Sequence, residues 1–402
     1  MESEIYKACR YNDINYVQAL IETSPNDTDI NRLESNGDTA LHFVCSKGYA
    51  NIARLLLNDH RVDRHRTNRN GQTAYEIAST EEIRQLFSRD RHSDNPFCTN
   101  QTTLNPLEVF TNEDNSSDSR YTTFYPSQDP IKKECLYRVY KEDYNTMTLP
   151  IINQLRRFFG NDPEKNKIDK WVKNLQKHIE QCFIVQNYEL NSTIYLNAYK
   201  CIEDYYKTKN IEYLLKLYTL HTLICQYFSQ NSIKIDYLYA PICFHLSNLS
   251  ERAYKGRCFR GLTMKENEFK KYKQAFDSKE SYIKTNTFCS TSIDLAVAEM
   301  FTKTNNIRGT INVIIMFDFV RSCSTAIVLF SSSSQLKCIS YFEDEKEVLI
   351  LPGTIFLVKN IQKDNQAQFT IIHLEKFDTT EMENESYKER FRNYFDNMFT
   401  DL

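Results

Sequence analysis

The sequence predicts a multidomain protein in which all-α repeats are followed by an α+β region. Three observations lead to this prediction. The chain has 402 residues, which exceeds the size that a single hydrophobic core usually supports. A pattern near the N-terminus recurs after 34 residues, from Gly37 to Gly71, as it does in repeat architectures. Beyond residue 130, apolar residues first follow helical spacing and then, after Cys258, gather into short runs typical of strands.

The overall composition argues against several kinds of binding site. The 50 basic and 53 acidic residues give a net charge of −3, which provides no field for holding nucleic acid or an anionic membrane. The eight glycines stand no closer together than Gly256 and Gly261, so the chain has no glycine-rich phosphate loop of the Rossmann or P-loop kind.

The cysteines, the histidines and the N-terminal segment predict a reduced environment without a metal site. The twelve cysteines form no CxxC pair and the eight histidines no HExxH motif, so we expect buried, reduced thiols. The N-terminal segment has no apolar core behind a basic head, and no stretch is long and apolar enough to span a bilayer. We therefore expect a cytoplasmic protein.

Residues 1–89 are expected to form the repeats. Residues 36–57, NGDTALHFVCSKGYANIARLLL, contain a turn followed by two short amphipathic segments. They resemble an ankyrin repeat, because Thr39 to His42 match its TPLH signature with Ala in place of Pro and Gly48 falls at the turn between its helices. A second copy follows, and residues 4–21 fit the two helices of a preceding repeat. The resemblance implies about three units with irregular ends, which bind another protein.

Residues 90–129 are rich in Ser, Asn, Asp and Thr and have little apolar periodicity. This composition predicts a flexible linker. An alternative is that Leu107, Val109 and Phe110 pin the segment to a neighbouring surface.

Residues 130–250 are expected to be helical and residues 251–377 to form a β-rich core. Helical spacing runs from Ile168 to Cys182 and from Leu214 to Ile224. The β-rich runs span residues 311–320, 347–358 and 369–377.

Residues 378–402 form a tail that is acidic at first and then places several apolar side chains on one helical face. This helix either docks on the protein or binds a partner. The apolar residues are Phe391, Tyr394, Phe395, Met398 and Phe399.

Three short motifs in the α+β region carry residue types suited to catalysis. The first, GRCFRGL at 256–262, places Arg260 directly before Gly261. The second is FCSTS at 288–292, which contains the tripeptide STS from Ser290 to Ser292. The third, ISYFEDEKEVLILP at 339–352, places two glutamates before an apolar strand.

In this order, the motifs resemble the Arg-Ser-Glu class of mono-ADP-ribosyltransferases, of the arginine-specific type. The resemblance covers about residues 130–375 and is strongest from 254 to 358. It implies an α+β ADP-ribosyltransferase fold, with a helical N-terminal part and a split β-sheet core. It also implies NAD as co-substrate, no metal, and a protein acceptor that presents an arginine.

The resemblance assigns roles to the residues that hold NAD. Arg260 binds the diphosphate, and the backbone of Gly261 approaches the nicotinamide carboxamide. Ser290 hydrogen-bonds the catalytic Glu347, which contacts the ribose. Thr291 and Ser292 brace the strand that lines the cleft. Phe301 either lies against the nicotinamide or is a core residue beneath its helix.

General chemistry supports these roles. Cleavage of the bond between nicotinamide and ribose develops positive charge on the ribose, as in glycosidases, and a nearby carboxylate such as Glu347 stabilises that charge. The planar fork of Arg260 is suited to the oxygens of a diphosphate, and its charge is permanent.

Glu345 is the residue that the resemblance links to the acceptor. A Glu two positions before the catalytic one accompanies transfer to arginine in this family. An arginine has a pKa above about 12, so it must be oriented and partly relieved of its proton before it attacks. Tyr341 and Phe342 either flank the incoming side chain or anchor the turn.

The predicted function is therefore transfer of ADP-ribose from NAD to a protein arginine, with release of nicotinamide and with the ankyrin units selecting or tethering the target. One alternative is an NAD glycohydrolase on the same scaffold, with water as the acceptor. A second is a non-catalytic ankyrin adaptor with a decayed transferase half, although decay would have been expected to remove Arg260, Ser290 or Glu347.

Overall fold

The chain folds into two compact units in the computed structural model. The first unit comprises Met1–Ser93, Glu180–His221 and Phe330–Lys346, and the second comprises Asp94–Ile179, Thr222–Leu329 and Glu347–Leu402. The residues that the structure describes are 2–23, 27–89, 98–99, 102–103, 105–110, 165–185, 192–220, 238–239, 241–243, 245–278, 281–302, 309–331, 336–364 and 369–377. The predicted tail helix lies outside them.

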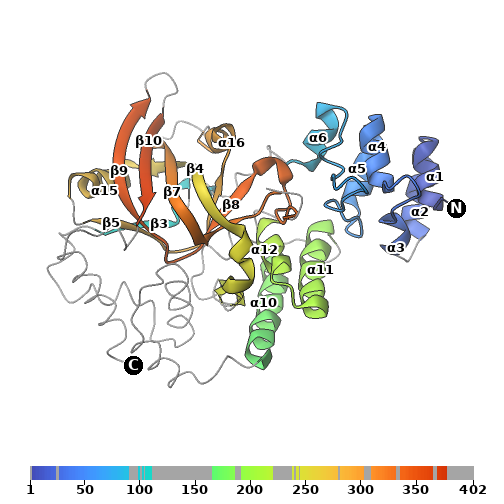
Figure 1. The fold of residues 1–402 in the computed structure, drawn as a ribbon, viewed down its shortest axis with the longest axis horizontal. Helices are drawn as coiled ribbons and strands as arrows, with labels where there is room; N and C mark the ends of the chain where they lie inside the picture. Colours follow the sequence, from blue (N-terminus) through green and yellow to red (C-terminus); the bar gives the residue numbers. More distant parts are fainter. Residues whose placement is uncertain are drawn as a thin grey trace. The chain divides into compact units, whose positions relative to one another are not determined.

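The N-terminal part of the first unit consists of short helices stacked in chain order (Figure 1). They are α1 (Glu4–Arg10), α2 (Ile14–Thr23), α3 (Asp27–Ile30), α4 (Ala40–Lys47), α5 (Ala50–Asn58) and α6 (Glu81–Phe87). The pairs α1–α2 and α4–α5 are the helix pairs of two successive repeats, as the sequence predicts.

Two turns with the same hydrogen bonds precede the second and the third repeat. The amide of Glu34 donates to the carbonyl of Asp38 at 2.9 Å, and the amide of Asn68 donates to the carbonyl of Gln72 at 2.8 Å. Gly37 and Gly71 occupy equivalent places in the two turns, with φ of +90° and +79°. Such φ values favour glycine because it has no Cβ.

His42 connects the two turns. Its Nδ1 accepts a hydrogen bond from the hydroxyl of Thr39 at 2.8 Å, and its Nε2 donates to the carbonyl of Gln72 at 2.9 Å. The ring is 1% exposed, and burial lowers the pKa of His42. A neutral imidazole therefore fixes the spacing of successive repeats.

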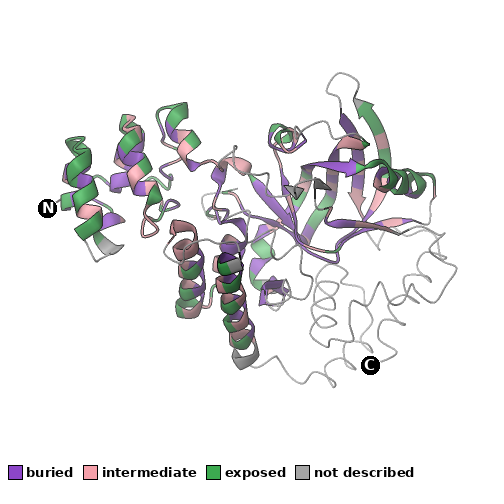
Figure 2. Ribbon diagram, turned by 180° about the vertical axis from the view of Figure 1, so that it is seen from behind, coloured by how far each residue is buried: buried purple, intermediate pink, exposed green. Residues whose placement is uncertain are grey.

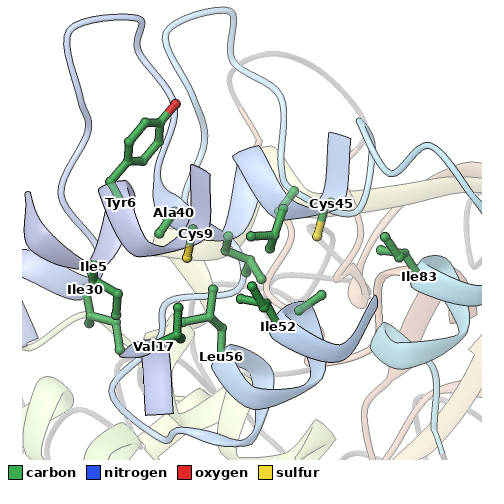
Figure 3. Close-up of a cluster of buried hydrophobic side chains, with 14 of the residues drawn as sticks. Ile5, Tyr6, Cys9, Val17, Ile30, Ala40, Cys45, Ile52, Leu56 and Ile83 are labelled. Carbon is green, nitrogen blue, oxygen red and sulfur yellow. The ribbon is translucent and has the colours of Figure 1, made fainter. Parts of the chain in front are cut away.

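A continuous layer of apolar side chains holds the repeats together. In Figure 3, residues from successive helices, from Ile5 of α1 to Ile83 of α6, point into this layer. Val17, Ile52 and Leu56 are each at most 1% exposed. Figure 2 shows the same helices with buried positions on one side and exposed positions on the other. Burial of this face in the neighbouring repeats is how repeat proteins gain stability.

The third repeat departs from the regular pattern. Its motif begins at Thr73, yet residues 74–77 form turns and not a helix. The amide and the hydroxyl of Ser79 both donate to the carbonyl of Cys45 at 3.1 Å. These bonds hold the chain at the end of α4, directly after the turn residues 74–77. This irregular end fits a capping repeat.

Helices also follow where helical spacing predicts them. They are α10 (Lys165–Val185), α11 (Thr193–Thr208), α12 (Glu212–Thr219) and the short 3-10 helix η2 (Leu246–Arg252). The predicted apolar stripe of α10 is buried at Trp171, Val172, Leu175, Ile179 and Cys182. The predicted positions Leu223 and Ile224 lie outside the described residues.

The second unit is built on an eight-stranded sheet in the order β3-β5-β9-β10-β7-β4-β6-β8 (Figure 1). Its strands are β3 (Leu107–Phe110), β4 (Ala253–Lys265), β5 (Tyr282–Thr285), β6 (Cys289–Ser292), β7 (Thr310–Val328), β8 (Glu347–Ile350), β9 (Ile355–Asp364) and β10 (Phe369–Lys376). A separate hairpin joins β1 (Cys98–Thr99) to β2 (Thr102–Thr103). The helices α15 (Glu266–Asp277) and α16 (Leu295–Met300) also belong to this unit.

The long strand β7 connects two parts of this sheet. Its first half pairs with β4 and β10, and its last residues, Ala326–Val328, pair with β8. Because β8 also pairs with β6, and β6 with β4, the strands β4, β6, β8 and β7 close on one another. The predicted run 347–358 is divided between β8 and β9, with Pro352 and Gly353 in the turn between them.

The segment expected to be a linker supplies one strand of the sheet. Leu107–Phe110 form β3, which pairs antiparallel with β5. Leu107 is 7% exposed, and the amide of Asn286 donates to the carbonyl of Pro106 at 2.8 Å. The backbone of these four residues pairs with β5 and Leu107 is buried, which agrees with the alternative of a pinned segment.

The cysteines agree with the expectation of buried thiols. The nine cysteines whose side chains the structure describes are all buried. Burial raises the pKa of the thiols of Cys9 and Cys45 to about 12, so these thiols are unreactive. None of the helices in the described part of the chain combines the length and the apolar character that a membrane crossing requires.

Candidate active site

Three neighbouring strands bring Arg260, Ser290 and Glu347 together in the second unit. Arg260 lies on β4, Ser290 on β6, and Glu347 is the first residue of β8. In the register of β6 with β8, Ser292 is opposite Glu347 and Ser290 is opposite Leu349. Because side chains alternate between the two faces of a strand, Ser290 and Glu347 share one face and lie diagonally across the pair.

Ser290 and Glu347 are directly hydrogen-bonded. The Ser290 hydroxyl donates to Oε1 of Glu347 at 2.5 Å, and Glu347 is only 3% exposed. A buried carboxylate is costly unless polar partners compensate for the lost water. The hydroxyl therefore both stabilises the charge of Glu347 and restricts its rotamer.

Arg260 joins the same cluster through the backbone. Its Nη1 donates to the carbonyl oxygen of Ser290 at 2.7 Å, and the residue is 5% exposed. Arg260 is paired with Ile315 of β7 in the sheet, so its backbone is held on a central strand. A permanent positive charge is thus buried beside the serine that contacts Glu347.

The other two residues of the STS motif make structural hydrogen bonds. The hydroxyl of Thr291 donates to the carbonyl of Val348 at 2.7 Å and so reinforces the pairing of β6 with β8. The hydroxyl of Ser292 accepts from the amide of Asp294 at 2.9 Å, and Asp294 caps the N-terminus of α16. These bonds connect β6 to β8 and to the turn before α16.

Gly261 is placed where the sheet and α16 meet. A Cβ built on Gly261 would overlap the backbone carbonyl of Ala298 and approach Cγ2 of Thr302 to 3.0 Å. The absent side chain lets α16 pack directly on β4. Phe301, half-buried, follows α16, and its amide donates to the carbonyl of Ala298 at 3.1 Å.

This packing predicts that Gly261→Ala lowers the free energy of unfolding by about 3 kcal/mol, since overpacking against a backbone atom forces the helix or the strand to shift. Urea denaturation followed by circular dichroism would measure the loss. Gly309→Ala is the matched control, because a Cβ there meets nothing within 4 Å. Its positive φ of +83° should cost only about 1 kcal/mol. Equal losses in the two variants would contradict the packing role of Gly261.

The remaining predicted residues lie in the first unit, because the division between the units falls between Lys346 and Glu347. We call Ile339–Lys346 the acceptor loop, after the role that the resemblance implies for Glu345. Its Glu345 ends the 3-10 helix η3 (Glu343–Glu345). Oε1 of Glu345 accepts from Nε of Arg89 at 2.8 Å, and Oε2 accepts from Nη2 of the same arginine at 3.2 Å.

The two aromatic residues of the acceptor loop are anchored. The guanidinium of Arg64 lies 4.2 Å from the ring centroid of Tyr341, and that of Arg89 lies 4.2 Å from the ring of Phe342. The Tyr341 amide donates to the hydroxyl of Thr219 at 2.8 Å. These contacts hold both rings against residues of the first unit.

Glu343, Arg64 and Arg89 belong to this arrangement and were not singled out from the sequence. The hydroxyl of Thr73 donates to Oε2 of Glu343 at 2.9 Å, and burial raises the pKa of Glu343 to about 7. Thr73 and Glu343 are 270 residues apart in the chain, so no local pattern connects them. The acidic run EDE at 343–345 contains Glu343 and the basic run RHRTNR at 64–69 contains Arg64, but neither run contains Arg89.

Comparison with known proteins identifies the N-terminal repeats. A family model described as ankyrin repeats matches residues 20–78. This match confirms the resemblance that the TALH motif suggests. A search of curated proteins finds no match to the chain.

Several solved structures are similar to the chain in fold. The Vis toxin, an ADP-ribosyltransferase from Vibrio splendidus, is 16% identical over 56% of this chain and 91% of its own, with a TM-score of 0.27. The ADP-ribosyltransferase HopU1 of Pseudomonas syringae is 12% identical over 63% of this chain and 99% of its own, with a TM-score of 0.27.

The type III effector XopAI from Xanthomonas axonopodis is also similar, at 14% identity over 56% of this chain and 95% of its own, with a TM-score of 0.33. Within the described residues, no three His, Cys, Asp or Glu side chains gather so that they could hold a metal ion. Residues 20–78 are thus ankyrin repeats, and an α+β region follows them.

Proposed function

We propose that this protein is a mono-ADP-ribosyltransferase that moves ADP-ribose from NAD to an arginine of a protein acceptor. The observation that carries the proposal is the hydrogen bond of 2.5 Å from Ser290 to Glu347, with Arg260 donating to the carbonyl of the same serine. A buried carboxylate with a fixed rotamer beside a buried guanidinium suits an anionic dinucleotide that develops positive charge on its ribose.

Glu347 acts on the bond that breaks. As the bond between the nicotinamide nitrogen and ribose C1′ lengthens, positive charge spreads over the ribose ring. A carboxylate that is already oriented stabilises this charge without having to reorganise during the reaction. Ser290 supplies that orientation, because its hydroxyl holds one carboxylate oxygen.

Arg260 is proposed to bind the diphosphate of NAD. A guanidinium presents five N–H donors in a planar fork that matches phosphate oxygens, and it stays charged at any physiological pH. The bond from Nη1 to the Ser290 carbonyl keeps this fork on the same strands as Glu347. Gly261 and Phe301 are proposed to meet the nicotinamide.

Glu345 is proposed to receive the acceptor arginine. In transfer, a guanidinium nitrogen forms a bond to ribose C1′ as nicotinamide leaves, and the proton that this nitrogen loses passes to a carboxylate. The contact of Glu345 with Arg89 supports this role, because both carboxylate oxygens accept from one guanidinium, at 2.8 and 3.2 Å. Glu345 is thus shaped to orient an arginine through a bidentate pair.

An incorporation assay tests the proposal. The purified chain is incubated with an arginine-rich acceptor protein and with NAD that is labelled in its adenosine part. We expect label on acceptor arginines and free nicotinamide in solution. Glu345→Ala should lower labelling by at least tenfold and leave nicotinamide release within about twofold, since one residual carboxylate, Glu347, suffices for cleavage. The proposal fails if neither label nor nicotinamide appears, and the role of Glu345 fails if both activities fall together.

One observation favours a second function, NAD glycohydrolysis. Glu345 is already engaged by Arg89, and water is an acceptor that does not need this carboxylate. If the intact chain is mainly a glycohydrolase, nicotinamide release should greatly exceed ADP-ribose incorporation even at saturating acceptor.

A further inference from the structure

We propose that Arg89 is a built-in competitor of the acceptor arginine, so that the ankyrin repeats inhibit transfer by occupying Glu345. The inference rests on the proposed function, since it assigns Glu345 to the acceptor. All the contacts that carry it lie within the first unit.

Arg89 makes with Glu345 the same interaction that an acceptor would need. Its Nε and Nη2 donate to the two carboxylate oxygens, which is the fork geometry of a bidentate pair. A guanidinium from another protein cannot donate to the same carboxylate lone pairs in the same plane while Arg89 remains. The two arginines therefore compete for one carboxylate.

The ion pair between Arg89 and Glu345 is largely buried. The side chains of Arg89 and Glu345 are 14% and 13% exposed, so solvent screens this pair less than a pair on the surface. One face of the Arg89 guanidinium is covered by the ring of Phe342, at 4.2 Å from its centroid. A cation over a desolvated ring adds to the attraction.

The ankyrin repeats hold the rest of the acceptor loop as well. Arg64 covers Tyr341, and Thr73 donates to Glu343 at 2.9 Å. With Arg89, these residues reach three positions of the loop from three separate places in the repeats.

Attachment to the same chain makes Arg89 a strong competitor. Tethered groups meet at effective concentrations in the millimolar range, so an external acceptor must compete with Arg89 at that concentration. When only a fraction of the molecules has the loop released, the apparent affinity for the acceptor falls by that fraction. NAD cleavage depends on Glu347 and does not share this cost.

A positioning role for the same contact makes the opposite prediction. If Arg89 held Glu345 in its working orientation, loss of Arg89 would slow transfer. If Arg89 blocks Glu345, its loss speeds transfer. The sign of the change therefore decides between the two roles.

The experiment compares the full chain with its Arg89→Ala variant, with NAD and a synthetic peptide that contains one arginine among Gly and Ser. We expect Arg89→Ala to lower the KM for the peptide by about tenfold or more, with nicotinamide release in the absence of peptide unchanged within twofold. Arg89→Lys keeps the charge but loses the fork, so its KM should fall between the two.

Arg10→Ala is the matched control. Arg10 lies at the end of the ankyrin helix α1 and pairs with Glu2 at 2.7 Å, but its side chain is 48% exposed. This variant should behave as the unaltered chain does. Unchanged thermal unfolding of Arg89→Ala would show that the repeats remain folded.

The outcomes separate this inference from the proposed function. If Arg89→Ala had the same KM for the peptide as the unaltered chain, or transferred ADP-ribose more slowly, inhibition by Arg89 would be overturned. The proposed transferase activity would still stand. Nicotinamide release without peptide labelling in both proteins would overturn the transferase. ADP-ribose found by mass spectrometry on Arg89 itself would also overturn the blocking role, because Arg89 would then be a substrate.

Discussion

Glu347→Gln is expected to lower the rate of nicotinamide release from NAD by about 10²- to 10³-fold, the range seen when one preorganised electrostatic group is removed from an active site. The substitution removes the negative charge that stabilises the ribose and keeps the shape of the side chain. The Ser290 hydroxyl can still donate to the amide oxygen, so the pairing of β6 with β8 should persist.

The measurement is the steady-state release of nicotinamide, together with the affinity for NAD by titration calorimetry. We expect affinity to change much less than rate, because Arg260 is retained. Glu375→Gln on β10 is the control: it removes a charge from the same sheet at a surface pair with Lys359, 2.7 Å long. If Glu347→Gln kept more than a tenth of the rate, another group would have to stabilise the ribose.

Part of the arrangement of the candidate site follows from the sequence. Glu347 begins a predicted β-rich run, whereas the resemblance alone assigns Arg260 and Ser290 to the site; the two-residue period of a strand then puts alternate side chains on one face. The sequence cannot supply the register that makes Ser290 and Glu347 diagonal neighbours across β6 and β8. That register depends on the closure of β8 onto β7.

The restraint on the acceptor loop could not be predicted. Arg89 and Glu345 are 256 residues apart, and helical or strand periodicity has no influence over such a separation. The same limit applies to Gly261, where the sequence indicates an approach to nicotinamide and the structure shows an approach to Ala298. Long-range packing, unlike local pattern, is decided by the whole fold.

Glu343 is expected to make the free energy of unfolding depend on pH. Burial is the main cause that raises its pKa from 4.5 to about 7, and Glu76 adds to it. The bond from Thr73 and the charges of Arg64 and Lys216 act in the opposite direction. His65, 3.9 Å from Glu343, is also buried, and burial lowers its pKa, so it adds little positive charge.

The sign follows from proton binding. Between pH 4.5 and pH 7, the folded protein keeps a proton on Glu343 that the unfolded chain releases. This group's stabilising contribution is therefore complete below pH 4.5 and is lost as the pH rises through about 7. A shift of this size corresponds to a loss on the order of 3 kcal/mol in the free energy of unfolding.

Glu343→Gln should remove this loss, because a glutamine is neutral at every pH and can still accept from Thr73. Urea denaturation at pH 5 and pH 8 would measure the free energy of unfolding of both proteins. Relative to the unaltered chain, Glu343→Gln should be more stable by about 3 kcal/mol at pH 8 than it is at pH 5. Glu81→Gln serves as the control, since Glu81 is 72% exposed. Parallel pH profiles for the unaltered chain and Glu343→Gln would mean that Glu343 is already ionised in the folded protein. Its contact with Thr73 would then be a charged one, and the acceptor loop would be held without a protonated carboxyl.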